Sequence, residues 1–543
     1  MAESDESRGL GCSMRDFLKT VREPDGRDIQ EVDEEIEILF ETTAVYRALE
    51  KRNPVILFNN IRGFPDYRIV TNVLGSRNRM ALAAGSGTME SVLEKWHGIV
   101  NGNDLLPDAS LVSRAPVKEI VHTGKDVNIL DIPAPWHYVE DGSRTNKGRY
   151  ITSGLAVTRD RESGIYNLSY SRMQLIDRNT YAFDVGSHGH FWKSVNDATE
   201  SGEKLQISVI IGAHPALYIL AASFTDNEYA KAARVISTSF TRGVKNSLQV
   251  PANAEIVLEA ELAEGEVYDE GPFAEYTGYL GMDSTRNLAK VKSVMRRHDP
   301  IFYDIQPSNS HEHVNLFSIP RSSVIMDTLR NSLPKGFNYS VEWPTYAARF
   351  LALAQIGNAR SGIEKQLGLS LMALDPLWAK IVSVTRGRSG LTLIEALVNI
   401  AYSLSANRFS SILIRDNYII SSDPVIRESG TNDKIILISD EYTGKVSDSI
   451  EGDIRTIMLK GSSVVISHAP VENATVNVVV PWHTDIADET EVGWAVATRT
   501  RPGDDIVTGG KKITIKADRK ALATPTIPGT AMERAKEIVG KLD

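Results

Sequence analysis

The sequence has a single cysteine, Cys12, among its 543 residues. A disulfide within the chain is therefore impossible, and zinc or iron–sulfur sites built from several thiolates are not expected. Neither the dinucleotide-binding pattern GxGxxG nor the phosphate-loop pattern GxxxxGK[ST] occurs. These absences argue against a redox-active disulfide, a thiolate metal centre and a nicotinamide-dependent dehydrogenase.

Excess positive charge is missing as well. The chain carries 60 Lys and Arg against 70 Asp and Glu, a net charge of -10. Nucleic acids and anionic membranes bind clustered positive charge, so neither is an expected partner. The N-terminus lacks a basic-then-apolar signal pattern. The longest apolar run, Ile207–Phe224, has His214 and Pro215 near its centre, which predicts two buried strands joined by a turn and no membrane span. We therefore expect a cytoplasmic enzyme.

Three regions differ in their hydrophobic patterns. Residues 1–117 mix amphipathic helical stretches with a short strand at Val55–Pro65, which predicts an N-terminal α/β part. Residues 118–320 are rich in short runs with period-2 alternation, which predicts a β-barrel or sandwich. Residues 321–543 alternate strands with helices, which predicts a C-terminal α/β domain. The length of the chain agrees with two or three domains.

Several segments make these predictions specific. In residues 255–267, one face of the expected strand carries Ile256, Leu258, Ala260 and Leu262, and the other carries Glu255, Glu259 and Glu261. In the last third we expect a strand at Lys380–Thr385, a helix at Leu391–Leu404 and a strand at Ser410–Ile414. The Gly-rich loops at 386–390 and 508–512 are expected to be plain connections. The helix has more apolar surface than one sheet face needs, which predicts a homo-oligomer.

Two glutamates bracket a break in residues 269–279, "DEGPFAEYTGY". On a regular strand Glu270 and Glu275 would point to opposite faces. Gly271-Pro272 interrupts the strand and allows both carboxylates to face one cavity, among aromatic neighbours. Burial would keep one acid protonated as a proton donor, and a nearby arginine would keep the other ionised. The alternative is a loop with two solvated glutamates.

Other polar residues could complete a site. Arg172 lies in the strand-like run "YNLSYSRMQ" with Asn167, and its guanidinium could bind a carboxylate in fork geometry. "GSHGHFW" contains His188 and His190, and Glu228 opens an expected helix. Amide, imidazole and carboxylate ligands suit Mn²⁺ or Mg²⁺, although the spacing matches no standard metal motif.

Taken in order, "RYITSGLAVTRD", "NLSYSRMQ", "GHFW", "NEYAKAA" and "EGPFAEYTGY" resemble the UbiD family of decarboxylases, which use prenylated FMN. The resemblance extends over roughly residues 40 to 330 and is weaker beyond. It implies an α+β and α/β multidomain fold: an N-terminal α/β part, a central split β-barrel that binds the flavin, and a C-terminal Rossmann-like α/β domain that mediates oligomerisation.

The resemblance also implies roles for individual residues. Arg172, Glu270 and Glu275 match the catalytic trio, and Arg172 and Tyr276 are expected to contact the substrate. Asn167, His190 and Glu228 match the ligands of Mn²⁺ (or Mg²⁺) at the flavin phosphate, with His188 as the alternative histidine, and a K⁺ ion accompanies this metal. The positions expected to line the flavin are Thr152, Asn167, Leu168, Ser169, Tyr170, Ser171, Arg172, Gly189, His190 and Glu228.

The C-terminal third departs from the family pattern. After Lys380 the expected Asp-rich run is missing, and a similar stretch, "HTDIADETEVGWAVATRTRP", appears about a hundred residues later, so no lysine is assigned to the flavin. The implied activity is reversible decarboxylation of an aromatic, heteroaromatic or α,β-unsaturated acid. Its implied partners are CO2, a flavin prenyltransferase and a second copy of the chain. The alternatives are an FMN oxidoreductase, an accessory subunit of a carboxylase and, more remotely, a glycosidase built on the glutamate pair.

Overall fold

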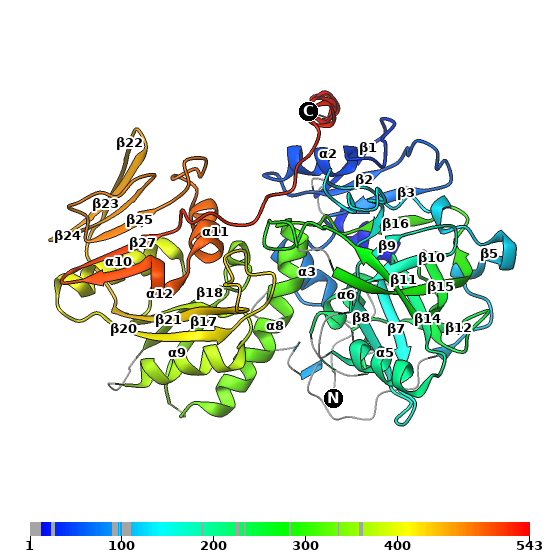
Figure 1. Ribbon diagram of the computed structural model, residues 1–543, viewed down its shortest axis with the longest axis horizontal. Coiled ribbons are helices and arrows are strands. Elements are labelled where there is room, and N and C mark those ends of the chain that lie inside the picture. Colours follow the sequence, from blue (N-terminus) through cyan, green and yellow to red (C-terminus); the bar gives the residue numbers. More distant parts are fainter. Residues whose placement is uncertain are drawn as a thin grey trace. The chain divides into compact units, whose positions relative to one another are not determined.

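The computed structural model describes residues 12–22, 28–88, 96, 98–99, 110–185, 189–223, 225, 227–232, 235–281, 284–334, 336–357 and 362–542 (Figure 1). The chain forms two compact units. The first comprises Met1–Arg321 and Thr524–Asp543, and the second comprises Ser322–Ala523. The expected N-terminal and central regions thus lie in one unit. The last twenty residues also belong to it, since α13 (Gly529–Val539) packs against α2 (Glu41–Leu49).

The N-terminal part of the first unit is built on a four-stranded sheet with the order β1-β2-β3-β16. The strands are β1 (Ile29–Val32), β2 (Val55–Phe58), β3 (Arg68–Thr71) and β16 (Ile301–Asp304). The pairs β1–β2 and β3–β16 are parallel, whereas β2–β3 is antiparallel. Helices α1 (Met14–Arg22) and α3 (Arg77–Ala83) complete this part. Because β16 comes from the far end of the central region, it joins the two regions.

The centre of the first unit is a nine-stranded antiparallel sheet that curls into a half-barrel. Its order is β6-β9-β10-β15-β14-β11-β7-β8, and β5 pairs with β15. The strands are β5 (Ile120–Thr123), β6 (Tyr150–Ile151), β7 (Leu155–Arg159), β8 (Tyr166–Tyr170), β9 (Met173–Leu175), β10 (Thr180–Phe183), β11 (Gln206–Ile211), β14 (Ile256–Glu270) and β15 (Ser284–Arg296). A short sheet of β4 (Ser110–Leu111), β12 (Ser239–Arg242) and β13 (Gln249–Pro251) accompanies it. The α/β multidomain fold with a split barrel is therefore confirmed.

The long strand β14 is buried on both faces near its start. Ile256 and Leu258 are buried as the alternation predicts, but Glu255 and Glu259 are buried too. Glu259 accepts backbone hydrogen bonds from residues 244–246, and Glu255 pairs with Arg15. Buried carboxylates need such partners, because an unpaired buried charge is costly.

One predicted strand is a helix. Within Ile207–Phe224 the first half is β11, as expected, but the second half forms α6 (Pro215–Ala221). The His214 side chain accepts a hydrogen bond from the Ala216 N–H, and Pro215 occupies the first turn. A side-chain cap followed by Pro at the first helical position is a helix start signal. The prediction was wrong because an all-apolar buried helix has no polar face to reveal its period.

Three further helices follow along the chain. They are α5 (His190–Ser201), α7 (Glu228–Ala232) and α8 (His311–Ser332), the last of which begins in the first unit. Both α5 and α7 pack against β8, and α6 does so as well. Helix α8 contains the division between the two units.

The second unit contains two sheets. The first has the order β17-β18-β19-β21-β20, with β17 (Asn338–Glu342), β18 (Leu351–Gly357), β19 (Ile381–Arg386), β20 (Ser410–Tyr418) and β21 (Thr431–Asp440). The second has the order β22-β23-β24-β25-β27-β26, with β22 (Ser447–Glu451), β23 (Ile454–Leu459), β24 (Ser462–Ser467), β25 (Val476–Val479), β26 (Ile506–Gly509) and β27 (Lys512–Lys516). The helices of this unit include α9 (Ile363–Leu374), α11 (Glu489–Arg499) and α12 (Pro502–Asp505).

Helix α10 (Leu393–Ser405) lies between these two sheets. It contacts β21 and β19 of the first sheet and β24 and β25 of the second. Its residues Leu397, Ile400 and Leu404 are buried. The surplus apolar surface of this helix, from which we predicted oligomerisation, is therefore used inside the unit, because a second sheet packs on it.

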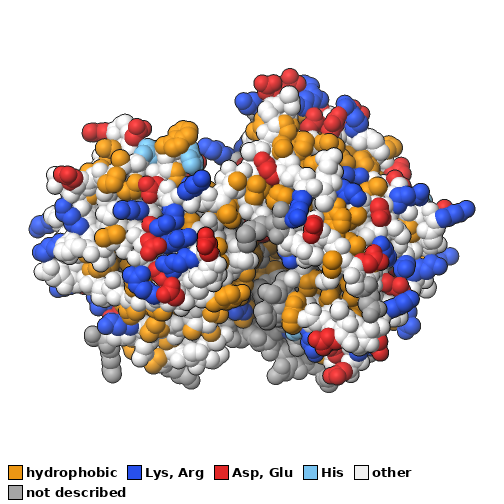
Figure 2. Space-filling model, in the orientation of Figure 1, with side chains coloured by type: hydrophobic (Ala, Val, Ile, Leu, Met, Phe, Trp, Pro, Cys, Tyr) orange, Lys and Arg blue, Asp and Glu red, His pale blue; other side chains and the backbone are white. Residues whose placement is uncertain are grey.

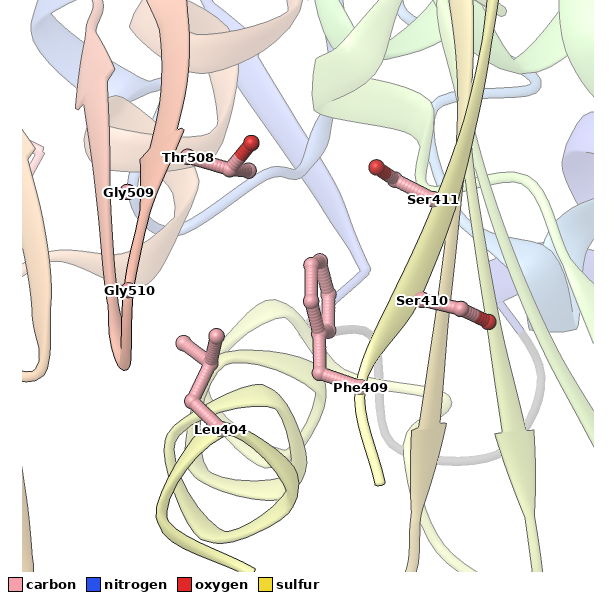
Figure 3. A pocket seen from close by; sticks show the side chains of 7 residues that line it. All are labelled: Leu404, Phe409, Ser410, Ser411, Thr508, Gly509 and Gly510. Carbon is pink, nitrogen blue, oxygen red and sulfur yellow. The ribbon is translucent and has the colours of Figure 1, made fainter. Parts of the chain in front are cut away.

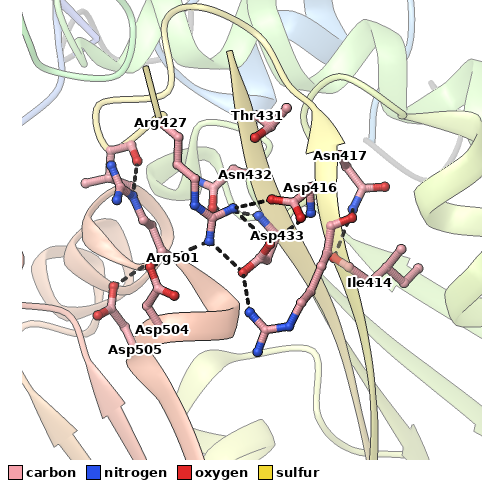
Figure 4. A network of polar contacts seen from close by, with 12 residues as sticks. Ile414, Asp416, Asn417, Arg427, Thr431, Asn432, Asp433, Arg501, Asp504 and Asp505 are labelled. Atoms are coloured by element: carbon pink, nitrogen blue, oxygen red, sulfur yellow. Dashed lines mark hydrogen bonds and ion pairs between the residues drawn. The ribbon is translucent and has the colours of Figure 1, made fainter. Parts of the chain in front are cut away.

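A network of charges also connects the two sheets of the second unit (Figure 4). Arg427 binds both oxygens of Asp433 on β21, with distances of 2.9 and 2.8 Å, and lies 3.6 Å from Asp504 of α12. Arg519 makes the corresponding pair with Asp505, at 2.7 and 2.6 Å. Bidentate pairs of this kind fix geometry more firmly than single contacts do.

The molecular surface mixes both signs of charge. On the face drawn in Figure 2, Lys and Arg side chains alternate with Asp and Glu side chains over both units. None of the described helices is long and apolar enough to cross a membrane.

Candidate active site

Four charged residues lie side by side at or near the ends of neighbouring strands of the curled sheet. Arg172 directly precedes β9, and Asp184 directly follows β10. Arg286 lies in β15, and Glu270 is the last residue of β14. These strands are neighbours in the order β9-β10-β15-β14. The backbone thus sets alternating positive and negative side chains side by side, at positions far apart in the sequence.

Arg172 joins the two predicted glutamates. Its Nε and Nη2 atoms each donate a hydrogen bond of 2.9 Å to Glu270, one to each carboxylate oxygen. Its Nη1 atom donates a hydrogen bond of 2.6 Å to Glu275. The Glu270 side chain is buried, with 1% exposed, whereas those of Arg172 and Glu275 keep 13% and 21%. The three residues predicted as a trio are therefore in direct contact.

The break after β14 brings the second glutamate back toward the first. Gly271 has φ +100°, a conformation that favours glycine, and the chain turns there. The Phe273 carbonyl then accepts a hydrogen bond from the Gly281 N–H, and the Glu275 N–H donates to the Tyr279 carbonyl. The turn replaces the strand geometry that would have sent Glu275 to the opposite face.

Asp141 holds this turn from behind. Its Oδ1 atom accepts the Ala274 N–H at 3.1 Å, and its Oδ2 atom accepts the Tyr138 N–H at 3.1 Å. The neighbouring Gly142 N–H donates to the Pro272 carbonyl. Asp141 is fully buried, and burial raises the pKa of its carboxyl to about 7. No sequence pattern pointed to this residue, because its partner lies 133 positions away.

The two glutamates have opposite pKa shifts. Burial raises the pKa of Glu275, and Arg172 opposes that rise only in part. Burial also acts to raise the pKa of Glu270, but Arg172, by its charge and its hydrogen bonds, together with Arg286 and Tyr150 outweighs it, so the pKa of Glu270 is lowered. Two neighbouring acids whose pKa values are pushed apart suit a proton donor and an ionised partner.

Asp184 and Arg286 add a second ion pair beside the trio. Arg286 Nη1 lies 2.7 Å from Asp184 Oδ1, and Arg286 Nε lies 3.5 Å from Glu270 Oε2. Asp184 Oδ2 lies 3.7 Å from Arg172 Nη1. Sequence reasoning missed both residues, since only the pairing of β10, β15 and β14 brings them to the site.

Aromatic rings line the rest of the cluster. The Arg172 guanidinium lies over the ring of Phe273, 5.0 Å from its centroid. Tyr276, predicted to contact the substrate, stacks on Phe317 of α8 with 3.9 Å between centroids. His313 lies at the edge of Tyr276, and burial lowers the pKa of its imidazole to about 4. Around neutral pH this histidine is uncharged.

The predicted metal ligands come from three elements. Asn167 lies in β8 and Glu228 begins α7, and the Glu228 carboxylate accepts the N–H of Leu168 at 3.1 Å. His190 begins α5, which packs on β8. His188 lies outside the described residues. Among the described residues, no three His, Cys, Asp or Glu side chains group closely enough to hold a metal. The predicted ligand set includes the amide of Asn167, so the statement about His, Cys, Asp and Glu does not apply to it.

Four of the residues predicted to line the flavin carry hydroxyl groups, and these groups have protein partners. Thr152 Oγ1 donates to Asp304 at 2.9 Å, and Ser171 Oγ donates to the Asp184 carbonyl at 2.8 Å. Ser169 Oγ accepts the Asn167 amide at 2.9 Å. Tyr170 donates to the Tyr218 carbonyl at 3.0 Å. Gly189 immediately precedes α5.

Carboxylates of the protein occupy backbone donors at the end of the Gly-rich loop 386–390 and at the start of α10. Glu395 accepts the N–H groups of Gly390 and Leu391 at 3.0 and 3.1 Å. Glu489, from the acidic stretch that resembles the family pattern, accepts the Leu393 N–H at 2.6 Å. The positive end of α10 thus faces carboxylates of the protein itself.

The other loop, 508–512, is the turn of the β26–β27 hairpin. It forms one side of a pocket of about 240 Å³, smaller than typical ligand sites. The lining residues are Leu404, Phe409, Ser410, Ser411, Thr508, Gly509 and Gly510 (Figure 3). Thr508 and Ser411 extend toward the gap from opposite sides, with Phe409 between them (Figure 3).

Two family models match the first unit. The 3-octaprenyl-4-hydroxybenzoate carboxy-lyase N-terminal domain matches residues 25–96, and the Rift-related domain of the same carboxy-lyase matches residues 110–310. The chain belongs to the UbiD family. It is therefore a carboxy-lyase. A relative from Aquifex aeolicus, itself uncharacterized, is 28% identical over 401 residues, which cover 67% of this chain and 79% of the relative.

Solved structures of UbiD-class enzymes share the fold. The enzyme HmfF from Pelotomaculum thermopropionicum, in complex with FMN, has a TM-score of 0.71 and 26% identity, covering 79% of this chain and 94% of HmfF. The apo 3,4-dihydroxybenzoic acid decarboxylase from Enterobacter cloacae has a TM-score of 0.70 at 21% identity, covering 81% of this chain and 98% of that one. An evolved dimeric form of HmfF contains prFMN, with a TM-score of 0.68 at 25% identity, covering 81% of this UbiD-family chain and 97% of that one.

Proposed function

We propose that this protein catalyses the reversible, non-oxidative decarboxylation of an aromatic, heteroaromatic or α,β-unsaturated carboxylic acid with prenylated FMN. The observation that carries the proposal is the contact of one guanidinium with two glutamates whose pKa values shift in opposite directions. One cation to hold a carboxylate and one protonated acid beside it are what replacement of CO2 by a proton requires.

Arg172 binds the substrate carboxylate. Glu270 occupies the Nε and Nη2 atoms of the guanidinium, so Nη1, which now contacts Glu275, is the group that a substrate carboxylate can share. Glu270 fixes the orientation of the guanidinium through its bidentate pair. The aromatic rings of Phe273 and Tyr276 are buried and give the site apolar walls, which favour release of neutral CO2 over retention of a charged carboxylate.

Glu275 supplies the proton. Burial raises the pKa of the Glu275 carboxyl, which favours its protonated form, and its oxygen lies 2.6 Å from Arg172 Nη1, beside the expected position of the scissile bond. The proton moves from the Glu275 carboxyl to the carbon that loses CO2, and solvent then reprotonates Glu275. The same groups in reverse order take a proton from the substrate carbon and permit carboxylation at high CO2.

The residues present fit the cofactor by their donor chemistry. Asn167, His190 and Glu228 offer amide, imidazole and carboxylate donors, which suit Mn²⁺ or Mg²⁺ at a flavin phosphate, with K⁺ beside it. Thr152, Gly189 and the Leu168–Ser171 backbone would line the flavin. When bound, prenylated FMN supplies the electron sink that an sp² carbanion lacks. We infer that a flavin prenyltransferase supplies it and that the chain forms at least a homodimer.

The test is to co-produce the protein with a flavin prenyltransferase, measure the mass of the bound flavin and assay CO2 release from a panel of aromatic and α,β-unsaturated acids. We expect prenylated FMN and CO2 release from at least one acid. Retention of unmodified FMN together with nicotinamide-dependent hydride transfer would favour the oxidoreductase alternative and contradict the proposal.

A further inference from the structure

The Asp184–Arg286 pair lies beside the predicted trio without belonging to it. Arg286 contacts Glu270, and Asp184 contacts Arg172. We infer that Asp184 and Arg286 are positioning residues that assign the transferable proton to Glu275 rather than to Glu270. The inference rests on the proposed function, because it concerns which of its two acids carries the proton.

The pair forms a dipole oriented along the row of strands. Arg286 faces Glu270, with 3.5 Å between Nε and Oε2, and Asp184 faces Arg172, with 3.7 Å between Oδ2 and Nη1. The two members are joined by the 2.7 Å contact of Arg286 Nη1 with Asp184 Oδ1. Their side chains are 24% and 28% exposed, so solvent screens them only in part.

The charges that face each glutamate are therefore unequal. Glu270 faces two cations, Arg172 and Arg286. The buried phenol of Tyr150 is also near it, and burial and the Glu270 charge raise the pKa of this phenol. Glu275 has one cation, Arg172, which it shares with Glu270 and Asp184. Opposite charges favour the ionised form of an acid, and like charges oppose it.

The directions of the pKa shifts agree with this arrangement. Arg286 is among the groups that lower the pKa of Glu270, after the larger opposing effect of burial and the effect of Arg172. Asp184 is among the groups that raise the pKa of Glu275, after burial and in opposition to Arg172.

The experiment measures the pH dependence of CO2 release in two single variants. If Glu270 must be ionised and Glu275 protonated, the acidic limb reports Glu270 and the basic limb reports Glu275. Arg286→Met removes a cation from Glu270, so the acidic limb should move to higher pH, by on the order of one unit. Asp184→Asn removes an anion from Glu275, so the basic limb should move to lower pH by a similar amount.

Two controls separate charge from packing. Arg286→Lys keeps the cation, so the acidic limb should stay near its wild-type position. Lys292→Met removes a half-exposed lysine from the same strand, paired at 3.4 Å with Glu261, and both limbs should stay in place. Infrared difference titration of flavin-free protein provides a readout without turnover. The protonated carboxyl band that Glu275→Gln abolishes should disappear at lower pH in Asp184→Asn.

The outcomes are distinct. The inference would be overturned if the limbs stay in place in both Arg286→Met and Asp184→Asn, or if they move in the same direction. The ion pair would then serve only to connect β10 and β15. An infrared band that does not move in Asp184→Asn would overturn it even if one variant folds poorly. If Glu275→Gln itself keeps full activity, the assignment of Glu275 as the proton donor fails, and if no acid of the panel releases CO2, the proposed function fails.

Discussion

Arg172 and Glu270 form a bidentate ion pair in which both carboxylate oxygens accept hydrogen bonds of 2.9 Å from one guanidinium. An ammonium group is a point charge and cannot reproduce this fork. We therefore predict that Arg172→Lys weakens substrate binding and turnover together. Loss of a charge-assisted hydrogen bond costs about 1.5–3 kcal/mol, so binding should weaken roughly tenfold to a hundredfold. Steady-state CO2 release over a range of substrate concentrations measures both quantities.

Arg178→Lys is the matched control, because Arg178 is exposed in the turn between β9 and β10 and donates to the Lys125 carbonyl. It should keep wild-type kinetics. If Arg172→Lys also keeps them, Arg172 does not anchor the carboxylate.

Asp141 gives a prediction about stability and pH. Burial raises its pKa to about 7 in the folded protein, whereas an unfolded Asp titrates near its ordinary value of about 3.9. The stability linked to this proton is thus fully present below the unfolded value and is lost as pH rises through about 7. Asn cannot titrate in this range. The difference in melting temperature between Asp141→Asn and wild type should therefore shift in favour of the variant as the pH is raised from about 5 to about 8.

Asp160→Asn serves as the control for Asp141→Asn. Asp160 is part of an exposed turn and accepts hydrogen bonds from the Ser163 and Glu162 N–H groups, which lower its pKa. Its difference from wild type should stay flat over the same pH range, since both of its pKa values lie below that range. An equally flat difference for Asp141→Asn would mean that Asp141 does not titrate there.

The carboxylate of Glu228 is predicted to hold the flavin through a divalent ion. Glu228→Ala should therefore release flavin during purification, measured as the flavin-to-protein absorbance ratio. Glu200→Ala, at an exposed position of α5, should keep it. His190→Ala should behave like Glu228→Ala. Full flavin occupancy in metal-free Glu228→Ala protein, or loss in His188→Ala but not in His190→Ala, would contradict this ligand assignment.

Self-association stays a prediction, although α10 does not supply the surface for it. Light scattering at micromolar concentration should give at least twice the mass of one chain. A monomeric mass would refute the expectation.

The period-two alternation of apolar residues in the central region and the succession of strands and helices in the last third were sufficient to predict the fold class. Hydrophobic periodicity and its interruptions are local properties of the sequence, so they can be recognised without the structure. The helix α6 was missed because its buried, uniformly apolar sequence hides the helical period. The second sheet over α10 was also missed, because a helix buried on two sides looks in sequence like one with a free face.

The approach of Glu270 and Glu275 was predictable from the glycine and the proline between them, and the part of Arg172 followed from the resemblance to the family. The charges that surround this contact were not. Asp184 and Arg286 meet only because β10 and β15 pair, with Phe183 opposite Asn287. Asp141 reaches the turn from a loop 133 residues earlier. Such relationships depend on register and topology, which single-sequence patterns do not encode.

The most direct test of the account is the behaviour of Glu275→Gln, which keeps the shape of the side chain and removes its transferable proton. General acids typically contribute about 10²–10⁴-fold, so CO2 release should fall by that factor while the substrate still binds. Incorporation of solvent deuterium at the vacated carbon should slow in parallel. Near wild-type rates of both CO2 release and deuterium incorporation in Glu275→Gln would contradict the assignment of Glu275 as the proton donor.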